Sequence, residues 1–210
     1  MKNYYIAIEG VIGVGKSTLA RLLQPILSAE ILLEVFEENP FLARFYQDRE
    51  RYAFQTQTFF LLSRYQQQHE AIPRALARSH LVSDYTFDKN KIFARLTLSG
   101  DELEMYERVQ DTLAERIPTP DLIVYLRASV DVLLERIELR DRAYERGMDR
   151  EYISALAQVY DDYFGNARTA PVLVLDTNAL DYVHRAQDLD KVVTLIRAKL
   201  REGAYQETLL

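Results

Sequence analysis

The segment from residue 10 to residue 17 constrains this chain more than any other part of it. It reads Gly-Val-Ile-Gly-Val-Gly-Lys-Ser and fits the pattern G-x-x-x-x-G-K-[ST] without a mismatch. A short apolar run precedes it and leucines at helical spacing follow it, which is the strand–loop–helix context that such a loop requires. The sequence therefore predicts a loop that binds the phosphates of a nucleoside triphosphate.

The residue types in this loop suit phosphate chemistry. Glycines let successive backbone N–H groups turn towards the phosphates, and the start of the following helix favours negative charge. The ammonium of Lys16 is expected to reach the β- and γ-phosphates of ATP, and the hydroxyl of Ser17 to bind Mg²⁺. The predicted ATP-binding residues are Gly10, Val11, Ile12, Gly13, Val14, Gly15, Lys16, Ser17 and Thr18. The pattern does not identify the group that accepts the phosphate.

Short β-prone runs alternate with helical stretches along the chain. The expected strands cover residues 4–8, 31–35, 80–84, 121–126 and 172–176, and a long helix is expected over 51–77. This alternation predicts a mainly parallel sheet with helices on both faces. Because 210 residues show no internal repeat and no linker, one α/β domain over residues 1–210 is the simplest account.

Composition narrows the classes of partner. The chain has no cysteine, which excludes disulfides and thiolate metal sites. A net charge of -6 without a basic tract argues against binding of a nucleic acid polymer. No apolar run approaches the roughly 20 residues that cross a bilayer, and no signal-peptide pattern is present, so we expect a cytoplasmic protein without a membrane partner.

Two carboxylates are expected at the ends of neighbouring strands. Glu34 lies at the end of the second expected strand, and Asp84 ends the third. Ligands of open α/β sheets bind beyond the carboxyl ends of the strands. In kinase chemistry one carboxylate can act as a base towards an attacking hydroxyl and another can hold the metal. Considered alone, each is more often an ordinary acid at the end of a strand than a functional one.

Several separated segments resemble the deoxynucleoside kinase family, which includes deoxycytidine, deoxyguanosine and deoxyadenosine kinases. The first covers residues 8–20 and includes the phosphate loop. The second is Glu-Val-Phe-Glu-Glu-Asn-Pro at residues 34–40, and another is Arg-Ile-Glu-Leu-Arg-Asp-Arg at 136–142. The resemblance runs through six segments from about residue 5 to 176. It implies a P-loop kinase fold, with a five-stranded parallel sheet in the order 2-3-1-4-5, an arginine-rich lid and a homodimer.

The resemblance also implies roles for individual residues. Glu34 becomes the base towards the 5′-hydroxyl, and Asp84 joins Ser17 at the Mg²⁺. The other substrate-binding residues are those for the sugar 3′-hydroxyl, Tyr46 and Glu151, and those around the base, Phe54, Gln57, Arg64 and Asn90. By helical spacing alone, Gln57 and Arg64 share a face that is more often solvated, and Phe54 is more often part of the core; the resemblance reverses this for Gln57.

Three arginines are expected in a lid over about residues 136–147. Arg136 and Arg140 lie one helical turn apart, and Arg142 follows just beyond them. Together with Lys16 they would stabilise the charge that develops during phosphoryl transfer. The alternative is a helix surface on which these arginines pair with neighbouring acids. Gly147 is the expected hinge where the lid ends.

The chain departs from the family pattern at two positions. The family has E/D-R-S after the third strand, where this chain has Asp84-Tyr85-Thr86. Tyrosine cannot replace the bidentate arginine that orients the 5′-hydroxyl and its phosphate. Asn90 stands where the family has an aspartate that contacts the base. Asparagine both donates and accepts hydrogen bonds, so we expect an altered base preference whose direction the sequence leaves open.

The function that the resemblance implies is ATP-dependent 5′-phosphorylation of a deoxynucleoside, with purine deoxynucleosides favoured. One alternative is a nucleoside monophosphate kinase such as a thymidylate kinase. That activity needs an arginine near the third strand, and Tyr85 argues against it. The other alternative is a regulatory protein that binds nucleotide without turnover, which the missing arginine leaves open.

Overall fold

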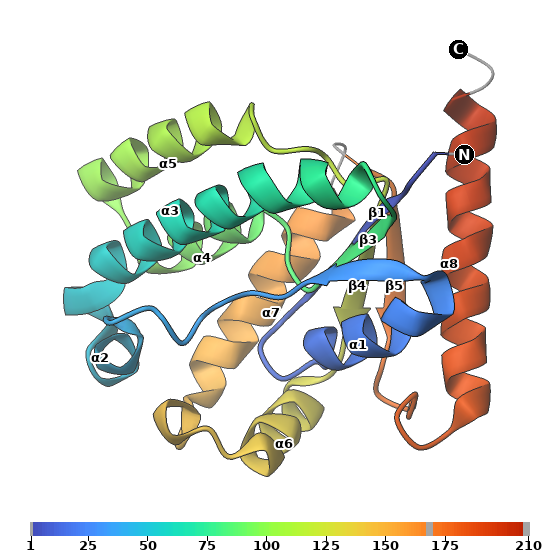
Figure 1. Ribbon diagram of the computed structural model, residues 1–210. Helices are drawn as coiled ribbons and strands as arrows, with labels where there is room; N and C mark the ends of the chain where they lie inside the picture. The colour runs from blue at the N-terminus through green and yellow to red at the C-terminus, as the bar shows by residue number, and fades with distance from the viewer. Residues whose placement is uncertain (1, 167–169, 208–210) are drawn as a thin grey trace.

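The computed structural model describes residues 2–166 and 170–207, and it is built around one sheet (Figure 1). The sheet consists of β1 (Tyr5–Gly10), β2 (Ala29–Leu32), β3 (His80–Ser83), β4 (Leu122–Arg127) and β5 (Val172–Asp176). All its neighbouring strands pair in parallel, in the order β2-β3-β1-β4-β5. The predicted fold class and strand order are therefore confirmed.

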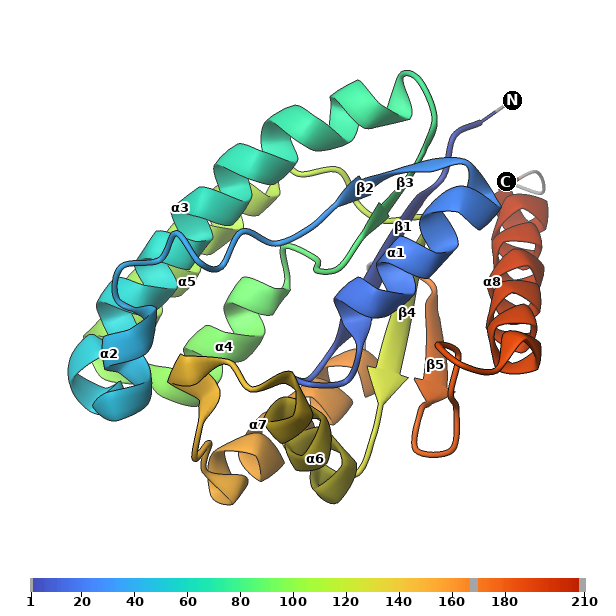
Figure 2. The same cartoon turned by 60° about the horizontal axis from the view of Figure 1, so that its bottom comes forward.

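Helices cover both faces of the sheet (Figures 1 and 2). One face carries α1 (Lys16–Leu27) and α8 (Ala186–Glu207). The other carries α3 (Arg49–Leu76), α4 (Lys89–Thr97) and α7 (Arg150–Gly165), and α5 (Gly100–Ala114) packs against α3 and α4. Around the carboxyl ends of the strands lie α2 (Leu42–Gln47), α6 (Val130–Arg140) and the 3₁₀-helix η1 (Ala143–Glu145).

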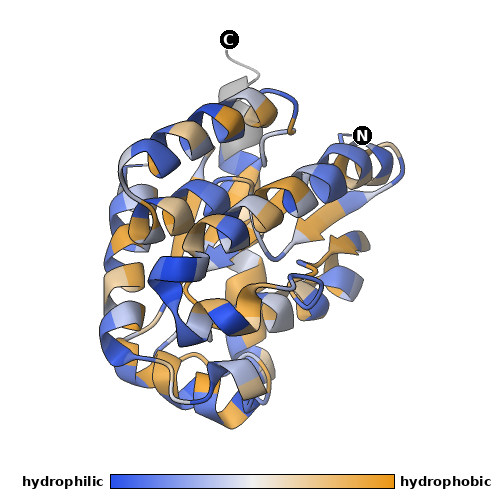
Figure 3. Cartoon of the chain, turned by 90° about the vertical axis from the view of Figure 1, so that its left-hand side faces the viewer, coloured by the Kyte–Doolittle hydropathy of each residue, from blue (hydrophilic) through white to orange (hydrophobic). Residues whose placement is uncertain are grey.

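The sheet is buried on both faces because helices cover both. Ile6 and Ile8 of β1 belong to the main core, while Tyr5 and Ala7, which point the other way, belong to a smaller cluster with Tyr85. In Figure 3, polar and apolar residues alternate around the helices, as expected for helices with one face on a core. Of the described helices, none combines the length and the apolar character that crossing a membrane demands.

The second strand is shorter than predicted and ends before Glu34. The prediction covered residues 31–35, whereas β2 ends at Leu32. Beyond Leu32, side chains form the hydrogen bonds to backbone groups that a longer β2 would have formed with its neighbouring strand. The amide of Gln67 donates to the carbonyl oxygen of Leu33 at 2.8 Å, and the backbone N–H of Glu34 donates to Asp84 Oδ1 at 2.8 Å. Glu34 is therefore fixed in a loop beside the end of β3.

The long helix extends nearly as predicted. The expected range was 51–77, and α3 covers Arg49–Leu76. Its start is capped by the side chain of Asp48, which accepts a hydrogen bond from the backbone N–H of Arg51. Pro73 lies inside the helix, but in its last turn, where few further backbone hydrogen bonds remain to be lost.

Candidate active site

The loop between β1 and α1 requires glycine at positions where a side chain would collide. Gly10, Gly13 and Gly15 all have positive φ, between 87° and 146°. A Cβ on Gly13 would lie 2.8 Å from the carbonyl oxygen of Leu133 in α6. This close approach brings the start of α6 against the loop.

Lys16 lies folded over this loop. Its Nζ donates to the carbonyl oxygens of Gly10 at 2.7 Å and Val11 at 3.0 Å. Burial, and next the positive charge of Lys89, lower the pKa of Lys16 to about 8. Phosphate groups in the loop would supply the negative charge that keeps this ammonium protonated.

Ser17 and Asp84 meet beside the loop. The Ser17 hydroxyl donates to Asp84 Oδ2, while Oδ1 of Asp84 holds the backbone of Glu34. A hydroxyl and a carboxylate are oxygen ligands of the kind that Mg²⁺ takes, usually in small number beside waters and substrate phosphates. Across the described residues, no group of three or more His, Cys, Asp or Glu side chains forms a metal cluster. The Ser17–Asp84 pair therefore fits Mg²⁺ bound mainly through phosphate and water.

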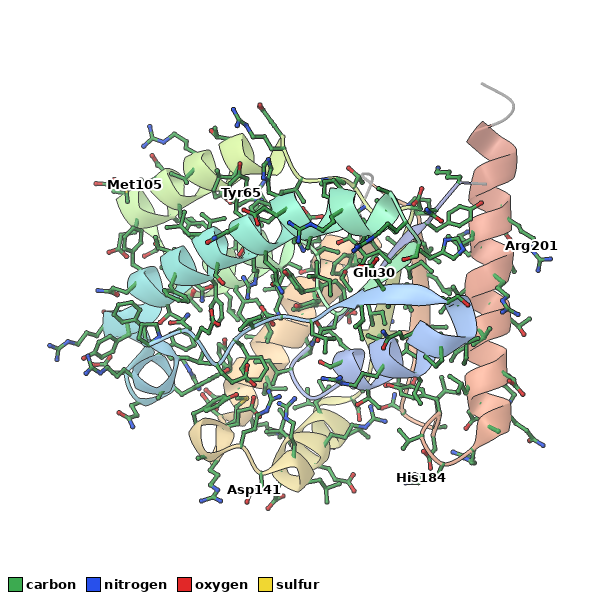
Figure 4. All side chains as sticks on the ribbon, viewed as in Figure 1. Glu30, Tyr65, Met105, Asp141, His184 and Arg201 are labelled. Carbon is green, nitrogen blue, oxygen red and sulfur yellow. The ribbon has the colours of Figure 1, made fainter. Side chains whose placement is uncertain are left out.

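Two pockets open on either side of the phosphate loop. The first, here called the deep pocket, reaches into the space bordered by α2, α3 and α4, and its charged lining is Lys16, Glu34, Arg64, Asp84, Lys89, Arg140, Arg142 and Glu145. The second, the outer groove, is lined by residues 13–18, three arginines of the α6 region and residues 178–185, including the His184 labelled in Figure 4. Five residues line both pockets: Gly13, Lys16, Ser17, Arg140 and Arg142. Ligands in the two pockets would therefore meet at the loop.

Glu34 is held between two cations in the deep pocket. Its Oε1 accepts hydrogen bonds from Arg64 Nε at 2.7 Å and lies 2.6 Å from Arg64 Nη2, and its Oε2 accepts one from Lys89 Nζ at 2.5 Å. The side chains of Glu34, Arg64 and Lys89 are 13%, 4% and 8% exposed. Burial alone would raise the pKa of Glu34, but Lys89 and then Arg64 lower it to about 2. Glu34 is thus an ionised hydrogen-bond acceptor at neutral pH.

Two amide side chains lie at or next to the deep pocket: Gln57 lines it, and Asn90 does not line it but contacts Arg64, which does. Arg64 Nη1 donates to Asn90 Oδ1 at 2.5 Å, and because a guanidinium only donates, the Asn90 amide N–H₂ must face away from it. Among the described residues, this buried N–H₂ and the Oε1 of Gln57 have no hydrogen-bond partner. Each such group costs about 1–3 kcal/mol while it stays unpaired, so a ligand that pairs it would bind favourably.

Three predicted substrate residues do not line the deep pocket: Glu151, Phe54 and Asn90. Glu151 is exposed in the first turn of α7, whereas Glu145 of η1 is buried and lines the pocket together with Tyr46. The prediction for Glu151 is corrected: the chain turns back after α6, and this turn brings Glu145, not Glu151, into the deep pocket.

Phe54 also lies outside the deep pocket, and it packs partly buried against the main core. Phe60 forms the wall instead. The two rings lie about 60° to either side of Gln57 around the helix axis, and the pocket is on the Phe60 side.

Of the three lid arginines, Arg140 and Arg142 both pair with Glu145, whereas Arg136 has other partners. Arg136 donates to the hydroxyl and the carbonyl oxygen of Thr177, at 3.0 and 2.8 Å, and so joins α6 to the end of β5. Arg140 donates to Glu145 at 2.6 Å, and Arg142 lies 4.1 Å from the Phe36 ring centroid. Asp141, labelled at the end of α6 in Figure 4, pairs with Arg146 rather than with these arginines.

Tyr85, which occupies the place of the family arginine, is turned away from the deep pocket. It is fully buried in the smaller core cluster, and its hydroxyl donates to Gln67 Oε1 at 2.5 Å. Sequence reasoning overlooked two charged residues that do line the pocket, Lys89 and Glu145. Only their positions in the sequence could have indicated them. Lys89 directly precedes Asn90, a predicted substrate residue, and Glu145 follows Arg142, a predicted lid residue, by three positions.

Comparisons with known proteins agree with this geometry. The chain is 34% identical over 198 residues to a deoxyguanosine kinase of Bacillus subtilis, with 92% of this chain and 96% of that one covered. It is 28% identical to a deoxyadenosine kinase of Lactobacillus acidophilus, with 94% and 96% covered. Among solved structures, a deoxyadenosine kinase from M. mycoides with the products dCMP and a flexible dCDP matches with a TM-score of 0.79 at 25% identity, covering 92% and 98% of the two chains.

The family assignment follows from the extent of these matches. The profile of the deoxynucleoside kinase family matches residues 6–201, which is almost the whole chain. The phosphate loop, the two pockets that meet at it and the parallel sheet are those of a phosphotransferase that acts on an alcohol. The chain belongs to the deoxynucleoside kinase family, the enzymes that transfer a phosphoryl group to the 5′-hydroxyl of a deoxynucleoside.

Proposed function

We propose that this kinase acts on purine deoxynucleosides with a carbonyl at position 6, deoxyguanosine first, with ATP and Mg²⁺. The observation that carries the proposal is the orientation of the Asn90 amide. Its oxygen is bound by Arg64, which lines the deep pocket, so its free group is a buried, unpaired hydrogen-bond donor next to that lining residue. The name of one relative, the B. subtilis deoxyguanosine kinase, supports the same substrate.

The donor on Asn90 discriminates between the two purines. Guanine presents a carbonyl oxygen at position 6, which accepts a hydrogen bond, whereas adenine presents an amino group, which donates one. An amino group facing the Asn90 N–H₂ would leave two buried donors without an acceptor. A site that hydrogen-bonds its substrate rejects a mismatched analogue strongly because its own polar groups are left unpaired.

The mechanism follows from the meeting of the two pockets. ATP in the outer groove would place its γ-phosphate at the loop, where Lys16, Arg140 and Arg142 face both pockets. The 5′-hydroxyl would donate to Glu34, which takes its proton as the oxygen bonds to the γ-phosphorus and the bond from phosphorus to the β-phosphate oxygen breaks. Mg²⁺ on Ser17 and Asp84 would neutralise phosphate charge. The products are ADP and the nucleoside 5′-monophosphate.

The sugar is proposed to contact Tyr46 and Glu145. Both line the deep pocket, and the ring of Tyr46 stacks on Tyr144 with ring centroids 6.0 Å apart. Burial raises the pKa of Tyr46 well above its ordinary value, so its hydroxyl remains protonated and can donate to the 3′-hydroxyl. Glu145 is an acceptor for the same group.

The test is phosphate transfer from ATP to deoxyguanosine, deoxyinosine, deoxyadenosine, deoxycytidine, thymidine, guanosine and the nucleoside monophosphates. We expect deoxyguanosine and deoxyinosine to give the highest kcat/KM. Asn90→Asp should lower kcat/KM for both by about 10-fold or more relative to deoxyadenosine, since it replaces the donor with an acceptor. Asn166→Asp, an exposed change at the end of α7, is the matched control. A wild-type preference for deoxyadenosine would refute the proposed base.

We also propose that the enzyme is a homodimer through the outer faces of α3 and α5. Large apolar side chains are exposed there: Leu62 of α3 at 53%, and Met105 and Val109 of α5 at 45% and 43%. Figure 4 shows Met105 on the outer side of α5. Light scattering should give about 49 kDa, twice the chain mass of 24.5 kDa, and Met105→Glu should lower it. A monomeric wild-type protein would contradict this assembly.

A further inference from the structure

The deep pocket lacks a cation at the position where the sequence led us to expect one. Tyr85 occupies the place of the family arginine, and its phenol ring is buried in the smaller core cluster on the other side of that backbone segment. Burial raises the pKa of Tyr85 far above neutral, so the phenol carries no charge at neutral pH. A phosphoryl transfer site still needs positive charge beside the acceptor oxygen, because the transferred phosphoryl group carries negative charge.

Lys89 places a cation in the deep pocket from a different element. It is the first residue of α4, four positions after Tyr85, and its side chain is 8% exposed and lines the pocket. Its Nζ donates to Glu34 Oε2 at 2.5 Å and lies 5.7 Å from the centroid of the Phe93 ring. Glu34 accepts one of the three ammonium N–H groups, so others remain to contact a phosphate.

The charge of the Lys89 ammonium acts on both the acceptor side and the donor side of the site. Its charge contributes to the low pKa of Glu34, the residue that faces the 5′-hydroxyl in the proposed mechanism. After burial, it is also the largest contribution to the low pKa of Lys16 in the phosphate loop. The other pocket cation near Glu34, Arg64, is already bound to Glu34 and Asn90. Lys89 thus pairs with the residue that faces the 5′-hydroxyl in the proposed mechanism, and its charge also acts on Lys16 of the loop.

We propose that Lys89 is a catalytic residue that contacts the 5′-oxygen and the transferred phosphate, in place of the arginine that this chain lacks. In the resting site Lys89 is paired with ionised Glu34. When Glu34 takes the proton of the 5′-hydroxyl it loses its charge, and the ammonium of Lys89 turns to the phosphate that has just become bonded to the same oxygen. Lys89 thereby exchanges its ion pair with Glu34 for one with the phosphate.

The inference rests on the kinase reaction and not on which base is preferred, so the test uses the deoxynucleoside that the wild-type enzyme phosphorylates fastest. Calorimetry measures the affinity of Lys89→Met for this nucleoside and for its 5′-monophosphate, which differ only in the phosphate. Lys89→Arg retains the charge. Lys91→Met is the matched control, because Lys91 lies on the same helix and pairs with Asp111 at 2.6 Å.

We expect Lys89→Met to bind the monophosphate about 10- to 100-fold more weakly and the nucleoside within about threefold of wild type. Its kcat should fall by at least about 100-fold, with partial recovery in Lys89→Arg and no change in Lys91→Met. An equal loss of affinity for both ligands would show that Lys89 only positions Glu34 and would overturn the proposal. Unchanged monophosphate affinity in the folded variant would overturn it as well. A different preferred base would refute only the proposed substrate.

Discussion

Glu34→Gln should lower both activity and stability, and the stability loss can be worked out from the pKa. The folded-state pKa of Glu34 is about 2, against an ordinary value of 4.5, because Lys89 and Arg64 outweigh the cost of burial. A carboxyl whose pKa is depressed on folding stabilises the protein above its unfolded pKa, and this contribution disappears as the pH falls through the folded pKa. The difference of about 2.5 corresponds to roughly 3 kcal/mol at pH 7 and roughly 1–2 kcal/mol at pH 3.

Urea unfolding of wild type and Glu34→Gln between pH 7 and pH 3 measures this directly. The wild type should be more stable by about 3 kcal/mol at pH 7, and the difference should shrink by about half at pH 3. Glu135→Gln, an exposed change on α6, controls for the loss of one carboxylate. A difference between the two proteins that stays constant over this pH range would mean that Glu34 titrates normally and would refute the ion-pair network as drawn.

The same substitution tests the catalytic role of Glu34. Glu34→Ala and Glu34→Gln should each lower kcat by about 100- to 10,000-fold, the usual contribution of a base that accepts a proton in the transition state. A loss below about twofold in a folded variant would remove Glu34 from that role.

Three further outcomes are expected. Gly13→Ala should abolish ATP binding, because a Cβ there would lie 2.8 Å from a backbone carbonyl oxygen of α6 at a φ of 87°; equilibrium dialysis with ATP checks it. Glu145→Gln should raise the nucleoside KM at least about 10-fold while Glu151→Gln leaves it unchanged, and the difference should vanish with a 3′-deoxy substrate. At pH 8.5 ATP binding should take up a proton, because the free enzyme holds the pKa of Lys16 at about 8 and phosphates raise it; the dependence of the binding enthalpy on the buffer measures that proton, and no uptake would contradict it.

The parts of the site that are local in sequence were predictable. The phosphate loop is a contiguous pattern whose glycines, lysine and serine each have a stated chemical need, and the loop forms where the pattern lies. Glu34 and Asp84 were expected together because parallel strands end at the same edge of a sheet. They do meet there, although Glu34 is held by side-chain hydrogen bonds in a loop rather than by the strand.

The parts that depend on side-chain direction were not predictable. Helical spacing groups Gln57 with Arg64, but it does not tell on which side of them the pocket lies, so Phe54 was predicted where Phe60 is found. Family spacing pointed to Glu151, yet the turn after α6 brings Glu145 into the pocket. That turn passes through Asp141 with a positive φ of 47°, a conformation that few residues adopt.

The sequence by itself thus determined the fold class, the phosphate loop and the kind of reaction, because periodicity and short motifs act within one element or between adjacent ones. Only the tertiary structure decided which charges face the acceptor, since Tyr85 and Lys89 lie four residues apart yet belong to the core and to the pocket. It also decided which way the Asn90 amide points, because Arg64, from a different helix, occupies its oxygen. Charges and hydrogen bonds act over a few ångströms in space, and that proximity arises only when distant segments of the chain pack together.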